Sequence, residues 1–359
     1  MRIALTIHAL QGGGAERALA RLAERWSTAG HEVHLITWSA VATDQISVPP
    51  AVQRHGLDLV RSSANLWQGL WANVRRIRAL RRKLRELQPD FVLSFCDQMN
   101  ISTLQAARGL RLPVWIAEHS DPSRQRLSRA WEWWRGRTYP RCTGCVALTS
   151  EIAGHLSQWV PLSRLTIIPN AVDPVEEIAA KLPARPSLLS VGRLSHEKGV
   201  DQLLQAWRLA HAQLGDWELR VVGDGPQRIS LEHQAADLPR VHFTGWMSDT
   251  AQAYRSATVF VLPSRYEGFP IALLEAMSHG LTCLATRCSQ AVEELSRGGE
   301  AVQVVSPESP ESLAAALIDL AANAQHRQQL GAAARCVSSQ YSWSRIGPLW
   351  DRLLVLYPS

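Results

Sequence analysis

The sequence predicts an α/β protein made of two doubly wound domains with parallel sheets, and three observations carry this prediction. The chain has 359 residues, which is too long for one ordinary core and suits two domains. Strand-like apolar runs alternate with amphipathic helical stretches along its length, which is typical of parallel sheets. A proline-punctuated, acidic stretch between Ile168 and Pro186 separates two such series, and we expect the hinge there.

Each predicted element follows from its local pattern. Residues 2–8 form a short apolar run that leads through glycines into an amphipathic stretch, 15–29, and Gly30 and His31 then precede a second strand. The expected strands are 2–8, 32–37, 90–95, 113–117 and 144–148, then 187–191, 218–222, 241–244, 258–262, 282–285 and 301–304; the expected helices include 15–29, 199–214, 271–279, 310–322 and 341–356. The domains expected from this series are 1–172 and 173–340, and the segment 341–359 is expected to cross back to the first domain.

The composition is that of a soluble globular protein, with 46% hydrophobic and 19% charged residues. No apolar run approaches the roughly 18–20 residues that span a bilayer. The apolar residues 3–10 include Thr6 and His8 and lack a cleavage site, so we expect no signal peptide. Six cysteines in so long a chain favour the reducing cytoplasm, and Cys142 and Cys145, whose C-x-x-C spacing precedes a strand, are interpreted as a chance pair.

The charge is distributed unequally along the chain. The net charge is +6, but residues 1–172 hold 22 Lys and Arg against 12 Asp and Glu, whereas residues 173–359 hold 16 against 20. This asymmetry predicts an anionic partner for the first half, either nucleic acid or a membrane surface.

Three glycines, Gly12 to Gly14, directly follow the first strand and open the first helix. Glycines let a backbone approach a ligand closely, and a helix N-terminus offers free N–H groups to phosphate. Arg17 stands where a dinucleotide motif has its third glycine, and no acidic residue ends the second strand, so a dinucleotide cofactor is not expected. A tight turn that binds nothing is the alternative.

Charged residues follow two strands of the second half. Arg193 and Lys198 frame the entry to a helix, where they form a plausible clamp for a diphosphate; a solvated pair of charges is the alternative. Glu267 lies in a loop after a strand, and Glu275 lies about one turn inside the next helix. Carboxylates accept hydrogen bonds from hydroxyls while a helix start faces phosphate, so this block suits a polyhydroxyl ligand with an anionic centre.

Together these motifs resemble the retaining glycosyltransferases of family 4, which have the GT-B fold. The resemblance implies two Rossmann-like domains whose parallel sheets face a cleft. Among family members, the chain looks most similar to enzymes that extend lipid-linked oligosaccharides and surface polysaccharides. The matching pieces follow the family's order: Gly12 to Arg17, Arg193 to Gly199, Val222 to Pro226, Phe243 to Gly245, and Glu267 to Glu275 followed by Ala276 and Met277.

The resemblance implies a site for a nucleotide-sugar. Glu275 would hold the ribose hydroxyls, while Arg193 and Lys198 would clamp the diphosphate. His119, after a strand of the first domain, would contact the donor sugar near the reacting carbon; a purely structural histidine is the alternative. The other donor-binding positions are Gly13 and Gly14, with Gly14 approaching from the opposite domain, and Glu267 with Gly268, Phe269, Pro270 and Ile271, which would meet the transferred sugar.

The implied mechanism retains the anomeric configuration and needs no metal. Breaking a glycosyl–phosphate bond develops positive charge on the sugar and negative charge on the diphosphate. Cations and helix N-termini would stabilise that leaving group, which would take the acceptor's proton in a front-face attack. Glu267 is not assigned as a nucleophile. The expected catalytic residues are His119, Glu267, Arg193 and Lys198, and no cofactor is expected besides the nucleotide-sugar.

Two segments hold much of the positive charge of the first half. Residues 75–85 contain seven basic residues, and apolar positions from Trp67 to Leu87 keep helical spacing, which predicts an amphipathic basic helix. Residues 124–141 add six arginines with interleaved tryptophans. Arg and Trp suit the headgroup region of a bilayer, and a solvated basic face is the alternative. The expected membrane or acceptor surface consists of Arg75, Arg78, Arg81, Arg82, Lys83, Trp131 and Trp134.

These observations lead to one functional hypothesis. We expect a retaining hexosyltransferase, peripherally bound to the inner face of the cell membrane, that moves a sugar from a nucleotide-sugar, expected to be a UDP-sugar, to a lipid-linked glycan. The alternatives are a transferase with a soluble acceptor and a catalytically inactive GT-B binding module. Nucleic acid is not expected as a partner, because no recognition motif accompanies the basic segments.

Overall fold

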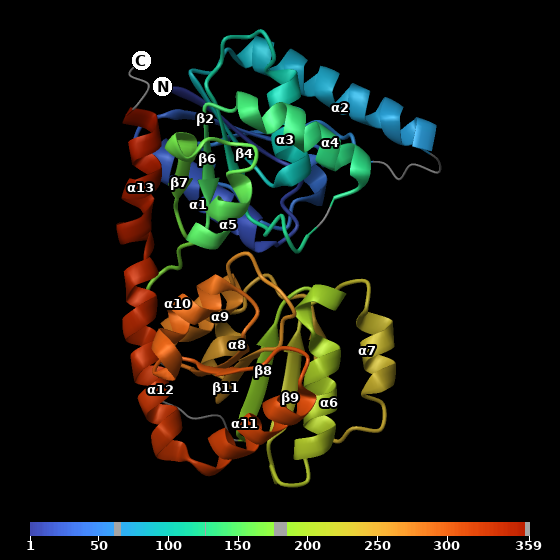
Figure 1. Cartoon of the computed structure of the whole chain (residues 1–359), viewed down its shortest axis with the longest axis vertical. Coiled ribbons are helices and arrows are strands. Elements are labelled where there is room, and N and C mark those ends of the chain that lie inside the picture. Colours follow the sequence, from blue (N-terminus) through green and yellow to red (C-terminus); the bar gives the residue numbers. More distant parts are fainter. Residues whose placement is uncertain (61–65, 126, 176–184, 356–359) are drawn as a thin grey trace. The chain divides into compact units, whose positions relative to one another are not determined.

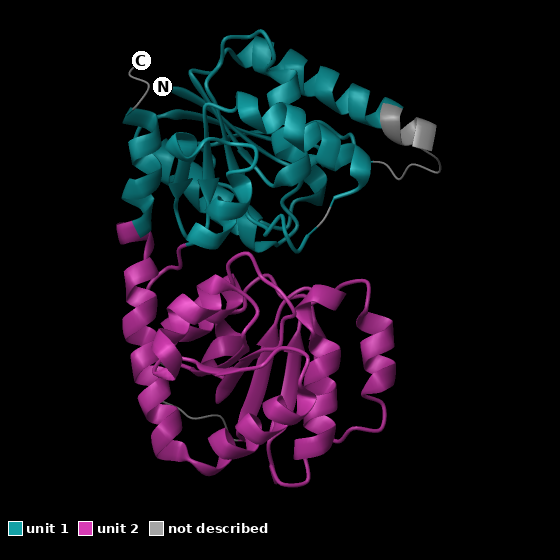
Figure 2. Cartoon of the chain, viewed as in Figure 1, with its two compact units in different colours: residues 1–170, 346–359 teal, residues 171–345 magenta. Residues whose placement is uncertain are grey.

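The computed structural model describes residues 1–60, 66–125, 127–175 and 185–355. The chain divides into two compact units, of which unit 1 comprises residues 1–170 and 346–359 and unit 2 comprises residues 171–345 (Figure 2). The boundaries expected from sequence lie after residues 172 and 340. Most of the expected acidic linker, with Pro183, lies outside the described residues, as do Arg126 and residues 356–359.

Within its described part, unit 1 contains a seven-stranded sheet with the order β3-β2-β1-β4-β5-β6-β7. All neighbouring strands are parallel, and Leu5 of β1 pairs with Leu35 and with Leu93. Helices cover both faces of such a sheet, which explains why its central strands are almost continuously apolar. The strands are β1 (Arg2–Ile7), β2 (Glu32–Thr37), β3 (Gln53–Gly56), β4 (Phe91–Phe95), β5 (Val114–Glu118), β6 (Gly144–Ala147) and β7 (Leu165–Ile167).

The helices of unit 1 position the ends of these strands. Three of them, α2 (Leu66–Leu87), α3 (Asp97–Ala106) and α4 (Arg129–Thr138), pack side by side (Figure 1). The side chains of residues 66–70, including Trp67, lie outside the described residues. The other α-helices are α1 (Gly14–Thr28) and α5 (Ser150–Leu156), and the short 3₁₀ helix η2 (Tyr139–Arg141) follows α4.

The last helix, α13 (Trp343–Val355), begins in unit 2, and its residues from Ile346 onward belong to unit 1. The carboxylate of Asp351 accepts hydrogen bonds from Arg25 Nε at 3.0 Å and from Trp26 Nε1 at 3.1 Å. Trp350 is buried and its ring lies 5.6 Å from that of Phe95. The end of α13 is therefore part of the core of unit 1.

Unit 2 contains, in its described part, a six-stranded parallel sheet with the order β10-β9-β8-β11-β12-β13. A core cluster joins one face of the sheet, through residues such as Val221 and Val259, to flanking helices, with Trp207 and Leu317 buried. The strands are β8 (Ser187–Val191), β9 (Glu218–Val222), β10 (Val241–Gly245), β11 (Val259–Leu262), β12 (Thr282–Thr286) and β13 (Gln303–Val305). The helices are α6 (Val200–Ala210), α7 (Arg228–Gln234), α8 (Ala251–Arg255), α9 (Ile271–Ser278), α10 (Gln290–Ser296), α11 (Pro310–Ala322) and α12 (Ala324–Ser338), with the 3₁₀ helix η4 (His196–Lys198) before α6.

The predicted fold class of two doubly wound α/β domains with parallel sheets is confirmed. The edge strands β3 and β7 were not expected from the sequence, nor were the helices α3, α4, α5, α7, α8, α10 and α12. Among the residues that the structure describes, no helix is both long and apolar enough to cross a bilayer.

Candidate active site

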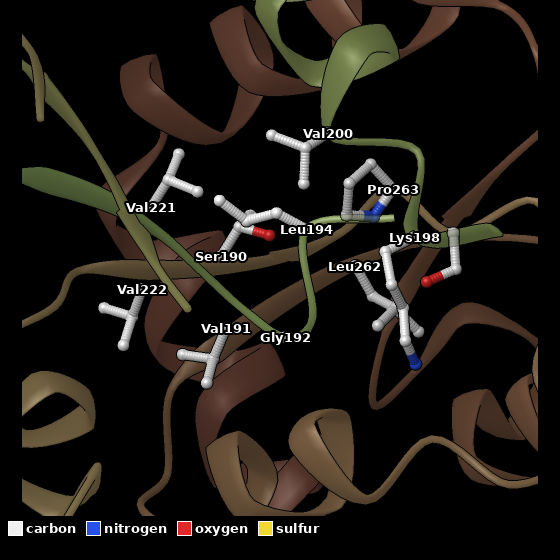
Figure 3. A pocket seen from close by; sticks show the side chains of 11 residues that line it. Ser190, Val191, Gly192, Leu194, Lys198, Val200, Val221, Val222, Leu262 and Pro263 are labelled. Atoms are coloured by element: carbon white, nitrogen blue, oxygen red, sulfur yellow. The ribbon is translucent and has the colours of Figure 1, made fainter. Parts of the chain in front are cut away.

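The strand order of unit 2 places two loops at a topological switch point. β8 and β11 are neighbours in the sheet although three helices and two strands separate them in the chain. Loops leaving such strands diverge, so a crevice opens at the carboxyl ends, where α/β proteins bind ligands. A pocket lies here (Figure 3), lined by Ser190, Val191, Gly192, Leu194, Lys198, Val200, Val221, Val222, Leu262, Pro263 and Ser264.

Glycines let the loops around this pocket touch one another through their backbones. Gly199 has φ 64°, and a Cβ atom there would stand 2.1 Å from the carbonyl oxygen of Pro263. Gly223 has φ 138°, and a Cβ atom there would stand 1.9 Å from the carbonyl oxygen of Gly192. Only glycine satisfies both demands, the left-handed conformation and the close approach, so these residues fix the loop after β8 against its neighbours.

A buried ion pair lies across the two loops at the switch point. Lys198 Nζ is 2.7 and 2.9 Å from the two carboxylate oxygens of Glu267, whose side chain is only 8% exposed. Ser264 Oγ donates a further hydrogen bond to Glu267 Oε1 at 2.8 Å. Burial by itself lowers the pKa of Lys198, but the charge and hydrogen bonds of Glu267 outweigh it and raise that pKa. The structure thus brings together two residues that the sequence placed in separate motifs.

Arg193 behaves differently from Lys198. It is exposed in the loop after β8, and within the described part of the chain it makes no ion pair. Its guanidinium group therefore remains available to an anion at the mouth of this loop.

The loop from Gly268 to Pro270 leads directly into α9, whose first residue is Ile271. Phe269 is buried against the ring of Tyr341, at 5.7 Å, and Pro270 precedes the helix without a side-chain cap. The first N–H groups of α9 have no partner inside the helix, so they can donate to an anion.

Glu275 lies on α9 and is held by a residue that sequence reasoning missed. Tyr254 of α8 is buried, and its Oη donates to Glu275 Oε2 at 2.8 Å. The ring of His279 packs at 5.2 Å from Tyr254, and His279 Nδ1 lies 2.9 Å from the carbonyl oxygen of Glu275. Neither Tyr254 nor Ser264 belongs to a local motif, and only the packing of the fold identifies them.

In unit 1, the glycine segment after β1 forms the start of α1. Gly13 is the N-cap residue, and its N–H donates to Glu16 Oε2 at 3.2 Å, a capping arrangement. Burial raises the pKa of Glu16, while His8, whose Nε2 is 3.4 Å from Glu16 Oε1, opposes this rise. Gly14 is the first residue of the helix. The Glu16 carboxylate thus accepts hydrogen bonds from the backbone of the glycine segment, including the N–H of Gly13.

His119 follows β5 directly and packs against Phe95 of β4, with 4.4 Å between the ring centroids. Both ring nitrogens are buried, and neither has a hydrogen-bond partner among the described residues. Burial lowers the pKa of His119 to about 3, so the imidazole is neutral near pH 7. Buried polar atoms are nearly always paired, so two buried ring nitrogens that lack a partner in the described part of the chain are an unusual feature of this position.

The basic residues of α2 divide into two groups. Arg75, Arg78 and Arg82 are exposed. Arg81 Nη1 instead donates to the carbonyl oxygens of Ala106 and Arg108, at 2.8 and 2.6 Å, where it caps the end of α3. Lys83 forms an ion pair with Glu86.

Helix α4 presents aromatic residues to solvent. Trp131 and Trp134 are half-buried and pack edge to face at 5.5 Å. Trp133 is 55% exposed, with Arg137 stacked 4.2 Å from its ring, and Trp71 of α2 is 67% exposed. Of the expected membrane or acceptor surface, only Arg75, Arg78 and Arg82 are exposed, while the exposed tryptophans are Trp71 and Trp133, which were not part of that expectation.

The cysteine pair is inert. Cys142 and Cys145 are buried free thiols, and burial raises the pKa of Cys142 to about 12. Burial also raises the pKa of Cys145 well above its ordinary value. Thiols of this kind do not ionise at neutral pH, so they are no redox site.

Comparison with known proteins gives two adjacent matches that together cover most of the chain. Residues 12–176 match the family described as Glycosyltransferase Family 4, and residues 185–323 match Glycosyl transferases group 1. The chain is 29% identical over 281 residues, 77% of each chain, to an alpha-1,4-N-acetyl-D-galactosaminyltransferase of Campylobacter jejuni. The name of that enzyme includes a glycan attached to diNAcBac-PP-undecaprenol. It is 28% identical over 349 residues, 92% of this chain and 87% of the relative, to the phosphatidyl-myo-inositol mannosyltransferase of Mycolicibacterium smegmatis. Among solved structures, Anabaena HepE in complex with UDP-glucose superposes with a TM-score of 0.81 at 18% identity, over 99% of both chains.

Proposed function

We propose a function on the premise that this chain belongs to the glycosyltransferases that join a family 4 domain to a group 1 domain. In this proposal, the protein moves a sugar from a UDP-sugar to a lipid-linked glycan at the cytoplasmic face of the cell membrane. Its two Rossmann-like units with parallel sheets match the GT-B fold of such enzymes. The observation that carries the proposal is the Lys198–Glu267 pair at the β8/β11 switch point, where a cation and a hydroxyl-binding carboxylate meet.

The donor binds in unit 2 in this proposal. The diphosphate takes the positive charge of Arg193 and Lys198 and the free N–H groups at the start of α9. The ribose hydroxyls donate to Glu275, whose orientation Tyr254 sets. A UDP-sugar is supported by the fold relative solved with UDP-glucose. Gly14 in unit 1 offers a further main-chain N–H group to the donor, while the N–H of Gly13 is already bonded to Glu16.

The reaction breaks the bond between the anomeric carbon and the diphosphate oxygen and forms a bond to the acceptor oxygen. The acceptor's proton passes to the departing phosphate, which balances the charge that develops on it. Lys198 and Arg193 stabilise this phosphate electrostatically, so we propose retention by front-face attack without a metal. Both oxygens of Glu267 already accept hydrogen bonds, which supports a role in binding the sugar hydroxyls rather than in attacking carbon.

His119 is the proposed contact of unit 1 with the donor sugar. A neutral imidazole can donate one hydrogen bond and accept another, and the depressed pKa of His119 supports the neutral form. A neutral ring also avoids placing a cation beside the positive charge that develops on the sugar.

The acceptor side is proposed to lie at a lipid surface. The exposed arginines of α2 and the tryptophans of α4 suit an anionic headgroup layer, to which each basic residue adds about 1 kcal/mol of binding. The names of the two relatives, a diphospho-undecaprenol glycan transferase and a phosphatidylinositol mannosyltransferase, support a lipid-linked acceptor. A soluble acceptor and an inactive binding module are the competing functions.

A panel of nucleotide-sugars tests the donor proposal. A ligand present at 100 times its dissociation constant stabilises the native state by about 2.7 kcal/mol, which a thermal melt detects. We expect a UDP-sugar to stabilise the wild type and not the Lys198→Met variant. Transfer of the stabilising sugar to a polyprenyl-diphosphate glycan then tests the acceptor. Stabilisation without transfer to any acceptor would identify a binding module instead.

A further inference from the structure

A buried polar cluster lies directly behind His119. Glu118, the last residue of β5, is 0% exposed. Its Oε2 accepts a hydrogen bond from Tyr139 Oη at 2.6 Å, and Ser120 Oγ lies 3.5 Å from its Oε1. Tyr139 is fully buried at the start of η2. The carboxyl group at the end of this strand is therefore tied to the segment that follows α4.

Arg135 joins the same cluster from α4. It is 0% exposed although the sequence placed it in a basic surface segment. Its Nη2 lies 3.7 Å from Asp97 Oδ2 and its Nη1 lies 3.3 Å from Glu132 Oε1. Its guanidinium carbon lies 5.7 Å from the ring centroid of Tyr139 and 5.2 Å from that of Trp159. A cation so enclosed fixes α4 to the beginning of α3 and lies against Tyr139, whose Oη donates to Glu118 at the end of β5.

The charges around Glu118 favour its neutral form. Burial and the negative charge of Asp97 raise the pKa of Glu118 to about 8, although Arg135 and the hydrogen bonds from Tyr139 and Ser120 oppose the rise. Burial is the main cause that raises the pKa values of the nearby thiols, Cys96 and Cys145, well above the ordinary thiol range. The titratable groups facing Glu118 are Asp97 of α3, Arg135 of α4, Tyr139 of η2, Cys96 after β4 and Cys145 of β6.

We propose that Glu118 is a positioning residue that works as a neutral acid: by holding the end of β5 to Tyr139, it keeps the His119 ring seated on Phe95. The proposal rests on the proposed function of His119. A carboxyl group that gains a charge in this enclosed cluster needs water or a rearranged Arg135, and either would displace the end of β5. The same ties connect His119 to the helix that carries the exposed Trp133.

The Glu118→Gln variant tests the proposal, because glutamine keeps the shape and the acceptor for Tyr139 but cannot ionise. We expect its kcat to stay within about twofold of wild type at pH 7 and to remain constant up to pH 9. The kcat of wild type should fall several-fold as pH rises through about 8. The KM for the donor should change less than kcat in both proteins, because the diphosphate and ribose contacts belong to unit 2.

Equilibrium unfolding gives a second measurement that does not depend on catalysis. A buried acid whose pKa is raised binds more protons in the folded than in the unfolded state, so the wild type loses stability as pH rises from about 4.5 to about 8. Glu118→Gln lacks this loss, and its stability relative to wild type should increase across that interval. The Tyr139→Phe variant should lower kcat at pH 7, while its KM for the donor changes little.

Three results separate the possible failures. A folded Glu118→Gln protein that is inactive at every pH would mean that the carboxylate itself is needed. A Glu118→Gln protein whose kcat falls at alkaline pH as that of wild type does would rule out the neutral-acid role. If the free energy of unfolding depends on pH equally in wild type and Glu118→Gln, Glu118 is not a neutral acid in the folded protein. If His119→Ala transfers sugar like wild type, the role of His119 fails, while the unfolding comparison still decides the charge state of Glu118.

Discussion

Lys198 Nζ donates hydrogen bonds to both carboxylate oxygens of Glu267, at 2.7 and 2.9 Å, across the two loops of the switch point in unit 2. The pair fixes the direction of both side chains before a donor arrives. In the proposed function, an incoming diphosphate shares the lysine while the carboxylate stays oriented for sugar hydroxyls. Such preorganisation avoids the cost of ordering the site at the moment of reaction.

Replacing Glu267 with alanine should lower kcat/KM for transfer by a factor of about 10² to 10³, the usual cost of losing a preorganised polar group at the reacting centre. The measurement is transfer from a radiolabelled nucleotide-sugar, with circular dichroism to establish that the fold is kept. Glu300→Ala, an exposed glutamate of unit 2, serves as the control and should be fully active. Full activity of Glu267→Ala would remove the site assignment.

Replacing Tyr254 with phenylalanine should raise the KM for the donor about three- to tenfold, because the hydrogen bond that orients Glu275 is lost. The kcat should change little, since the ribose is remote from the bond that breaks. A donor analogue without the ribose 2′ and 3′ hydroxyls gives the matched control, and wild type and variant should bind it equally. A variant that weakens binding of both donors alike would show that Tyr254 acts only through the fold.

Replacing Gly199 with alanine should destabilise the protein by about 3 kcal/mol, from left-handed strain of about 1–2 kcal/mol and overpacking against the carbonyl of Pro263. Gly215 supplies a matched control, because its φ is 56° but a Cβ atom there meets nothing within 4 Å. Gly215→Ala should therefore cost only the strain. Urea unfolding measures both, and equal losses would show that the contact with Pro263 relaxes freely.

Reversing the charge of Arg75, Arg78 and Arg82 to glutamate should reduce binding to vesicles of phosphatidylglycerol and phosphatidylcholine by well over tenfold, at about 1 kcal/mol for each residue. Flotation with the vesicles measures this. Arg81 is left unchanged because it caps α3. The same charge change at the exposed Arg255, Arg345 and Arg352 is the control. If both triple variants float equally, net charge and not this surface determines binding.

The elements that local sequence patterns predicted are those whose burial is complete or strictly one-sided. β8 occurs at the expected residues because a parallel strand covered on both faces reads as a largely apolar run, and β9 does so because buried Leu219 and Val221 alternate with the half-buried Arg220. The strand β3 was missed because it is a four-residue edge strand with polar, half-buried residues. The helix α3 was missed because its polar residues, such as Asn100 and Thr103, are buried, so no amphipathic period remains.

The residues of the candidate site also differ in whether a local sequence pattern could identify them. Motifs contiguous in the chain, such as the Glu267–Glu275 block, were identified, while partners from distant segments were not. Tyr254 is 21 residues from Glu275 and contacts it only because α8 packs near α9. Arg135 has the sequence context of a surface arginine, yet it is enclosed by Asp97 and two aromatic rings. Long-range packing of this kind leaves no local pattern to recognise.

The position of α13 in the chain imposes an order on folding. Trp350, Leu353 and Leu354 are buried in unit 1, whose strands all precede residue 170, so this core is completed by residues that follow the whole of unit 2 in the chain. While unit 2 is being synthesised, the apolar surface of unit 1 around Phe95 therefore lacks the helix that covers it. A nascent chain stalled before residue 346 therefore carries a sheet with a missing helix, and such a chain is a natural substrate for chaperones.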